Sequence, residues 1–208
     1  MKIIWMVLEG KFHSHITIMC DSDRIDELRL LCRQLYCKVT VIDLERGDRS
    51  QQDIMLTHYF HTKHGQYSSV EEIRSKLEND CVILKEHGFD AVRIKLEHES
   101  LPTNNPTADT YREIHFKCVM PSIERDAIIQ QMAEFDSTIV PSSNPFEKLK
   151  DGNIVQFFNK RYYEGTVEEV DQSSVMIEDH LNTLCTVKEV KRESVVFDTN
   201  LEHDKWWA

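Results

Sequence analysis

Residues 12–34 read FHSHITIMCDSDRIDELRLLCRQ, and residues 112–134 read REIHFKCVMPSIERDAIIQQMAE. Each stretch opens with alternating apolar and polar residues around a histidine, His15 in the first and His115 in the second. A turn rich in Asp, Ser or Pro follows, and apolar residues then recur every three or four positions. Alternation predicts a β-strand, and the wider spacing predicts an amphipathic helix. The same strand–helix unit is therefore predicted twice, a hundred residues apart.

Further segments match in the same order in the two halves of the chain. The matched pairs are residues 52–60 with 152–163, 70–73 with 167–170, and 94–97 with 190–193. Each half then has the order β-α-β-β-α-β, which is that of a ferredoxin-like sandwich. We predict an α+β fold of two tandem ferredoxin-like (βαββαβ) halves with pseudo-twofold symmetry. The alternative is that any chain with this element order shows such matches without a duplication.

The predicted boundaries follow from composition. Residues 1–100 form the first half, and residues 111–200 form the second. Between them, residues 101–110 are rich in Pro, Asn and Thr, which is typical of a linker. The chain ends in a tail, residues 201–208, with two adjacent tryptophans. Exposing both to water is costly, so we expect at least one to dock onto the body or onto a partner.

Composition excludes several classes of function. The 208 residues carry a formal net charge of −11, whereas phosphate-led binding to duplex nucleic acid needs a basic face. No stretch approaches the roughly 18 apolar residues that span a membrane, and the start of the chain does not have the pattern of a signal peptide. The six cysteines include no C-x-x-C pair, so we expect reduced, buried thiols and a cytoplasmic protein.

The candidate catalytic residues lie in the two histidine-containing strands: His15, Thr17, His115 and Lys117. Residues i and i+2 of a strand point to the same side, so each histidine shares a face with the second residue after it. If these faces met about a twofold axis, one neutral imidazole could act as base and the other, protonated, as acid. Thr17 and Lys117 could hold phosphate oxygens. Alternatively, both histidines lie on a half-exposed sheet face without a catalytic role.

The tripeptide HIT at 15–17 resembles the His-x-Thr/Ser motif of the 2H phosphoesterases. Those enzymes have two related lobes that each bring such a strand to a central cleft, and they cleave cyclic phosphates or 2′,5′-type phosphodiesters. The resemblance covers two tripeptides and implies that His15 and His115 form an acid–base pair. The second tripeptide, HFK at 115–117, departs from the motif because Lys117 replaces the hydroxyl residue. The replacement of the hydroxyl by an ammonium group weakens the expectation that the chain hydrolyses a phosphoester more than the expectation that it binds an anion.

The sequence also resembles an uncharacterised bacterial family of tandem ferredoxin-like domains. The residues that carry this resemblance are KLE at 95–97, YREIHFK at 111–117 and VVFDTNLEHDKWW at 195–207. They are similar to the forms Y-F-E-x-H-x-K and V-Y-D-S-N-x-x-x-D-x-G-W of that family. The resemblance implies the tandem fold over nearly the whole chain, and it implies no activity.

Three histidines, His58, His61 and His64, lie within seven residues, and imidazole is a common metal ligand. The spacing is unfavourable, because a strand residue and its third neighbour point to opposite sides. We therefore assign no metal site, predict no cofactor, and prefer to interpret these histidines as the exposed end of a strand. A mixed cluster that includes His13 and His15 stays open.

The candidate anion-binding residues are Arg93, Lys95, Lys160 and Arg161. Lys191, on the last predicted strand of the second half, belongs to the same set of strand cations. Arg and Lys side chains on strands near the middle of a sheet can receive a phosphate or a carboxylate. In the alternative interpretation, they form the solvated side of half-buried strands.

Two hypotheses for the function follow. The first is a phosphoester- or nucleotide-directed protein, a 2H-like phosphodiesterase, with its site between the two halves and a small phosphorylated ligand or nucleotide as partner. The second is a non-catalytic module that binds a ligand or a protein through an exposed sheet or through the tail, and self-association fits this hypothesis. Neither duplex nucleic acid nor a membrane is an expected partner.

Overall fold

The structure is a computed structural model of the 208-residue chain. It describes residues 10–46, 49–62, 67, 69–101, 110–147, 149 and 151–204. The chain forms two compact units. Unit 1 comprises Met1–Thr40, Ile54–Glu99 and Val196–Asn200, and unit 2 comprises Val41–Asp53, Ser100–Val195 and Leu201–Ala208, as far as these residues are described.

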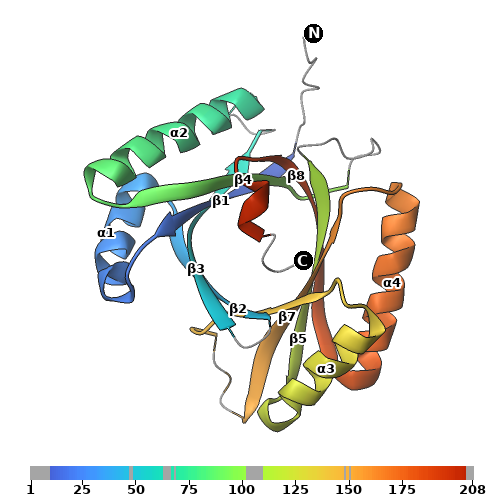
Figure 1. The fold of residues 1–208 in the computed structure, drawn as a ribbon. Coiled ribbons are helices and arrows are strands. Elements are labelled where there is room, and N and C mark those ends of the chain that lie inside the picture. The colour runs from blue at the N-terminus through green and yellow to red at the C-terminus, as the bar shows by residue number, and fades with distance from the viewer. Residues whose placement is uncertain are drawn as a thin grey trace. The chain divides into compact units, whose positions relative to one another are not determined.

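Eight strands and four α-helices, with three short 3₁₀ turns, make up the described chain (Figure 1). The first four strands and their helices are β1 (Lys11–Met19), η1 (Ser22–Arg24), α1 (Ile25–Leu35), β2 (Lys38–Arg46), β3 (Arg49–His61), α2 (Val70–Glu86) and β4 (Asp90–His98). The remaining elements are β5 (Tyr111–Pro121), η2 (Ser122–Glu124), α3 (Arg125–Phe135), β6 (Val140–Ser143), β7 (Asn153–Tyr162), α4 (Val167–Leu184), β8 (Thr186–Asp198) and η3 (Leu201–Asp204).

The strands follow a closed hydrogen-bonded order, β1-β3-β2-β6-β7-β5-β8-β4, and form an eight-stranded antiparallel barrel. The predicted pair of tandem ferredoxin-like halves with pseudo-twofold symmetry is therefore wrong, as is the description of the chain as a duplicated ferredoxin-like fold. In such halves the second and fourth strands would be open sheet edges. Here β2 pairs with β6, with Asp43 opposite Ser143, and β8 neighbours β4. Closure gives each edge strand a partner for its backbone N–H and C=O groups.

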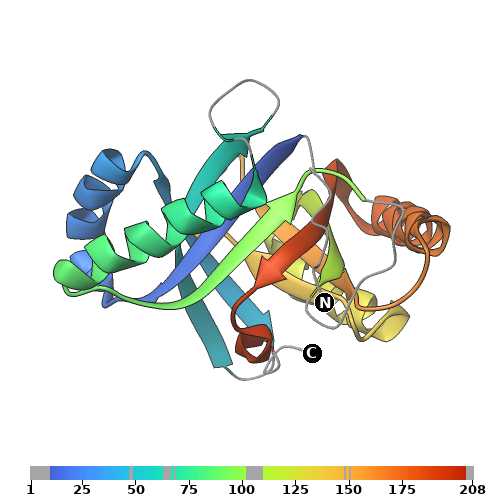
Figure 2. The ribbon, with the colours of Figure 1, turned by 90° about the horizontal axis from the view of Figure 1, so that it is seen from above.

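In unit 1, α1 and α2 lie along the strands β1, β3 and β4 (Figures 1 and 2). Both helices bury an apolar stripe, which includes Leu28 and Leu35 of α1 and Leu77 of α2. Alternation along β1 buries Phe12 and Ile16 on one face of the strand. His13 and His15 alternate with these residues and therefore point to the opposite face.

Unit 2 has a separate apolar core beneath α3 and α4 (Figure 1). Phe116 of β5 and Phe158 of β7 face each other across the register and are fully buried. Met132 of α3 and Leu181 of α4 belong to the same core. As in β1, alternation along β5 directs His115 to the face opposite this core.

The start of α4 has a capping box, in which the Thr166 hydroxyl accepts a hydrogen bond from the Glu169 N–H and the Glu169 carboxylate accepts one from the Thr166 N–H. We expect Thr166→Ala to reduce the free energy of unfolding by about 1 kcal/mol, because the Glu169 N–H of the first turn loses its hydroxyl acceptor. Urea denaturation measures the change. The control is Thr183→Ala on the exposed last turn of the same helix, where a change within about 0.5 kcal/mol is expected. Equal losses in the two variants would contradict the capping role.

Some predicted features lie outside the described residues. These are most of the linker, residues 102–109, and the end of the tail, residues 205–208, with both tryptophans. All six cysteines are free thiols, and Cys32 and Cys118 are buried. Across the described part of the chain, no helix has the length and apolar character needed to cross a membrane.

Candidate functional site

Strand β1 lies between β3 and β4 in unit 1, and this position assembles a cluster of polar side chains. The register places His15 opposite Thr57 of β3 and Lys95 of β4, and it places His13 opposite Glu97. Alternate residues of a strand share a face, so both histidines point away from the apolar core. We call His13, His15, Lys95 and Glu97 the unit 1 cluster.

Glu97 is the centre of the unit 1 cluster. Its Oε2 lies 2.6 Å from His13 Nε2 and 3.1 Å from His15 Nε2. Its Oε1 lies 2.6 Å from Nζ of Lys95. Of the Glu97 and His13 side chains, 1% and 3% are exposed, compared with 17% of His15. Solvent therefore has most access to the cluster at His15.

The surroundings of His15 favour its neutral form. Burial lowers the pKa of His15 most strongly, and the charge of Lys95 adds to this effect, while Glu97 opposes it without reversing it. The His15 Nδ1 lies 3.0 Å from Thr57 Oγ1, which lies 2.8 Å from Thr40 Oγ1. Burial acts to raise the pKa of Glu97, but Lys95 and the imidazoles outweigh it and hold this pKa well below its usual range. A neutral imidazole thus lies next to an ionised carboxylate.

Thr17, the other predicted catalytic residue of β1, is on the same face as His15, and its side chain is buried. Its Oγ1 has no hydrogen-bond partner among the described residues. A buried hydroxyl without a partner costs about 1–3 kcal/mol. The register partner of Thr17 on β4 is Arg93, one of the predicted anion-binding residues.

Unit 2 has a cluster of similar composition. Strand β5 lies between β7 and β8, with His115 opposite Asn159 and Lys191. The His115 Nδ1 lies 2.6 Å from Asn159 Oδ1, and its Nε2 lies 3.2 Å from Glu193 Oε2. Lys191 forms an ion pair with Glu193. We call His115, Asn159, Lys191 and Glu193 the unit 2 cluster. In both units a histidine meets a glutamate through Nε2, and a lysine precedes that glutamate by two residues.

The two clusters differ at the residue before the central histidine on the same face. Where unit 1 has His13, unit 2 has Glu113, whose Oε1 accepts a hydrogen bond of 2.8 Å from Arg161 Nε. The predicted catalytic Lys117 donates a hydrogen bond of 2.5 Å to Glu147. The structure therefore brings His15 and Thr17 onto one face in unit 1, and it directs Lys117 of unit 2 toward a carboxylate.

Each predicted anion-binding residue has a carboxylate partner. The pairs are Arg93 with Asp198, Lys95 with Glu97, Lys160 with Asp136, and Arg161 with Glu113. Arg93 and Lys95 are 5% and 7% exposed, so the solvated-face interpretation does not describe them. An anionic ligand would compete with these carboxylates for the cations.

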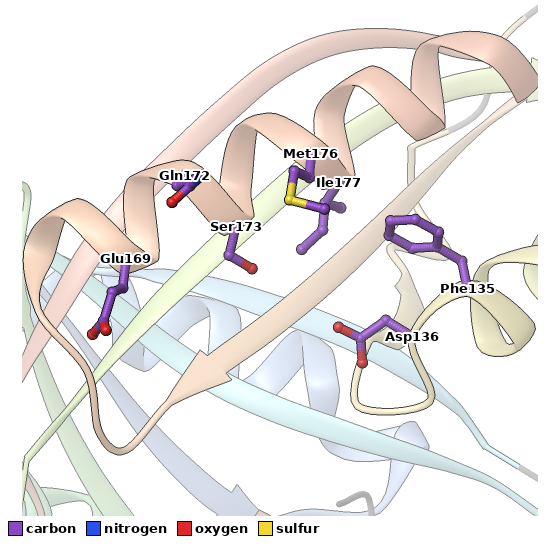
Figure 3. Close-up of a pocket in the computed structure, with 7 residues that line it drawn as sticks. All are labelled: Phe135, Asp136, Glu169, Gln172, Ser173, Met176 and Ile177. Atoms are coloured by element: carbon purple, nitrogen blue, oxygen red, sulfur yellow. The ribbon is translucent and has the colours of Figure 1, made fainter.

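Lys160 is on the opposite face of β7 from Arg161, because the two are adjacent in a strand. Its partner Asp136 follows α3 and lines an open hollow of about 390 Å³ between the end of α3 and α4 (Figure 3). The other lining residues are Phe135, Glu169, Gln172, Ser173, Met176 and Ile177. Nothing in the described part of the chain indicates what covers this hollow.

Of the three closely spaced histidines, His58 does not fit the interpretation as an exposed strand end, since it is only 2% exposed. The His58 Nε2 lies 3.0 Å from Asp80 Oδ2, and its Nδ1 lies 3.4 Å from Ser14 Oγ. His61 ends β3 and is half-buried, and His64 lies outside the described residues. His58 therefore makes a buried polar contact with Asp80 of α2.

Sequence reasoning assigned no role to the glutamates of the two clusters. The pattern Lys-x-Glu occurs at 95–97 and again at 191–193, within segments that had been matched to each other. This recurrence could have identified Glu97 and Glu193, since i and i+2 share a face with the lysine. Asp198 was also not predicted as the partner of Arg93. It lies in residues 195–207, which resemble the uncharacterised bacterial family.

Comparisons with known proteins add little. No protein-family model matches the sequence, and no curated protein matches it. One solved structure with some likeness is "Putative monooxygenase" from Fusobacterium nucleatum subsp. nucleatum. The identity is 9%, the match covers 93% of this chain and 95% of that chain, and the TM-score is 0.31. A likeness at this level carries no argument about fold or function.

Proposed function

We propose that the protein binds a small phosphorylated ligand or nucleotide at its polar strand faces and transfers a proton there through His15 and His115. The observation that carries this proposal is the recurrence of one arrangement in both units, a histidine next to a glutamate with a lysine beside it. Glutamate stabilises the imidazolium that forms when the ring takes up a proton, and lysine contributes positive charge. Phosphoester cleavage is a reaction class that uses both functions.

The buried Thr17 hydroxyl supports ligand binding in unit 1. It lies on the same face as His15 without a described hydrogen-bond partner. A hydrogen bond to a ligand oxygen would therefore remove the free-energy cost of burying this hydroxyl unpaired. Lys95 lies on the neighbouring strand, opposite His15. A ligand that reaches Thr17 would therefore also meet the imidazole and the ammonium group.

One observation favours the alternative of a non-catalytic binding module. Both ring nitrogens of His15 have close polar neighbours, Glu97 and Thr57, and those of His115 have Glu193 and Asn159. A ligand must displace one of these neighbours before the ring can exchange a proton with it. Binding without turnover is the result expected from the alternative.

Turnover of 2′,3′-cyclic nucleotides and short oligonucleotides, with calorimetric titration of the same compounds, tests the proposal. We expect His15→Gln and His115→Gln each to reduce kcat by about 10²- to 10⁴-fold, because a general acid–base group is lost. The control is His87→Gln, at the exposed C-terminal end of α2, which should retain full activity.

Melting temperatures of all variants separate loss of chemistry from loss of fold. If the wild type binds these compounds without cleaving them, the non-catalytic module replaces the enzyme. If it neither binds nor cleaves them, or if His87→Gln loses as much as the other variants, the proposal fails.

A further inference from the structure

We propose that His13, His15 and Glu97 form a binding site for one divalent transition-metal ion, zinc above all, with the ion bound to His13 Nε2, His15 Nε2 and Glu97 Oε2. Each of the three residues offers a ligand atom that lies within 4.8 Å of those of the other two. The inference requires only these three side chains to bind an ion. It concerns the metal-loaded chain, because an ion on His15 Nε2 would occupy the nitrogen that proton transfer by His15 uses in the metal-free chain.

The separations of the ligand atoms suit a zinc ion. Bonds of about 2.0–2.1 Å in a tetrahedral site place neighbouring ligand atoms about 3.3 Å apart. In the metal-free arrangement, Glu97 Oε2 lies 2.6 Å from His13 Nε2 and 3.1 Å from His15 Nε2. Shifts of less than about 1 Å would therefore convert the hydrogen-bonded arrangement into a coordinated one.

The ligand types determine which metals fit. Two imidazole nitrogens and one carboxylate oxygen suit zinc, iron(II), cobalt(II) and related ions, and they disfavour calcium and magnesium, which take mainly oxygen ligands. Three protein ligands leave a coordination position for water or a substrate, as in catalytic zinc sites. His15 has the most exposed side chain of the three, so the open position is expected on its side.

The neighbours of the ligands resemble the outer shell of a metal site. Metal-binding histidines usually engage their second ring nitrogen in a hydrogen bond, which sets the tautomer and the ring orientation. His15 Nδ1 lies 3.0 Å from Thr57 Oγ1, which is held by Thr40. Glu97 Oε1 lies 2.6 Å from Lys95 Nζ, so Oε2 is the oxygen directed at the imidazoles.

Unit 2 is a natural contrast. At the position equivalent to His13 it has Glu113, and Arg161 already binds that carboxylate. Lys191 binds Glu193 there, as Lys95 binds Glu97 in unit 1. Unit 2 therefore differs in offering one imidazole where unit 1 offers two, and the Glu113 carboxylate at the position of His13 is already neutralised by Arg161. We expect one metal ion per chain, bound in unit 1.

Zinc binding to the full, chelator-stripped chain tests the inference, measured by competition with a chromophoric chelator, with cobalt(II) absorption as a second readout. We expect one zinc per chain and tetrahedral-type cobalt bands. Thr57→Val removes a hydrogen-bond partner of a ligand and should weaken zinc binding by about 10- to 100-fold. His13→Gln removes a ligand itself and should weaken zinc binding by more than about 100-fold. His87→Gln, an exposed histidine, is the matched control and should bind zinc like the wild type.

The inference is overturned if the wild type binds zinc no more tightly than His13→Gln. Should His13→Gln not fold, Thr57→Val decides, and unchanged affinity in that variant overturns the inference as well. The assay contains no phosphoester, so its outcome is separate from that of the proposed function. We expect His115→Gln to bind zinc like the wild type even if it loses turnover. If the wild type turns over substrate but does not bind zinc, only the metal site is refuted.

Discussion

We expect Asp198→Ala to reduce the free energy of unfolding by about 3–5 kcal/mol, because the change leaves Arg93 buried without its charge partner. Arg93 Nε donates a hydrogen bond of 2.9 Å to Asp198 Oδ1, and the second guanidinium contact goes to Oδ2. The two side chains are 4% and 0% exposed. The adjacent Thr199 and Asn200 also bond to β4, so Asp198 lies at the point where β8 is attached to that strand.

Urea denaturation measures this loss, and Asp126→Ala is its control. Asp126 also pairs with an arginine, Arg125, but its side chain is 93% exposed. Exposed ion pairs contribute about 0–1 kcal/mol, so the control should lose little. Similar losses in the two variants would show that burial of the Arg93 pair does not determine its effect.

The pH dependence of this difference has a defined sign. Burial acts to raise the pKa of Asp198, but the hydrogen bond and charge of Arg93 outweigh it, so the pKa is lowered in the folded protein. In the unfolded chain an aspartate titrates near about 3.9. The contribution of the pair is therefore present above that pH and is lost as the pH falls through the lower folded pKa. The stability gap between wild type and Asp198→Ala should narrow below about pH 4, and a constant gap would contradict this account.

A loss of about 3–5 kcal/mol is also expected for Phe158→Ala, for a different physical reason. Phe158 is fully buried in the unit 2 core with Phe116 and Met132, so removing the ring loses its burial and leaves a cavity. The matched control is Phe146→Ala, whose ring is 58% exposed and should change stability by less than about 0.5 kcal/mol.

Equilibrium denaturation of these two variants should show the same m-value as the wild type if only the folded core changes. A small loss for Phe158→Ala would mean that the core collapses around the missing ring. A large loss for Phe146→Ala would mean that this exposed ring packs against the body.

Local patterns correctly identified the face of β1 and β5 that carries the polar clusters. His15 and Thr17 share a face with His13, as alternation requires, and the apolar neighbours of His15 are buried. The same patterns did not identify Glu97, although the Lys-x-Glu recurrence could have done so, and its contacts with the two histidines come from the register of β4 against β1. Three of the four predicted anion-binding residues have carboxylate partners on other elements, namely Asp198, Asp136 and Glu113, and a strand pattern contains no information about such partners.

The fold class shows the same division. By itself, the sequence determined where strands and helices form and which side of each is apolar, because periods of two and of three to four residues depend only on neighbouring positions. Only the tertiary structure decided that β2 pairs with β6 and that β8 lies beside β4, which turns two expected open sheets into one closed barrel. Edge pairing and the pairing of buried charges join residues as far apart as Arg93 and Asp198, and they depend on which surfaces must be removed from water together.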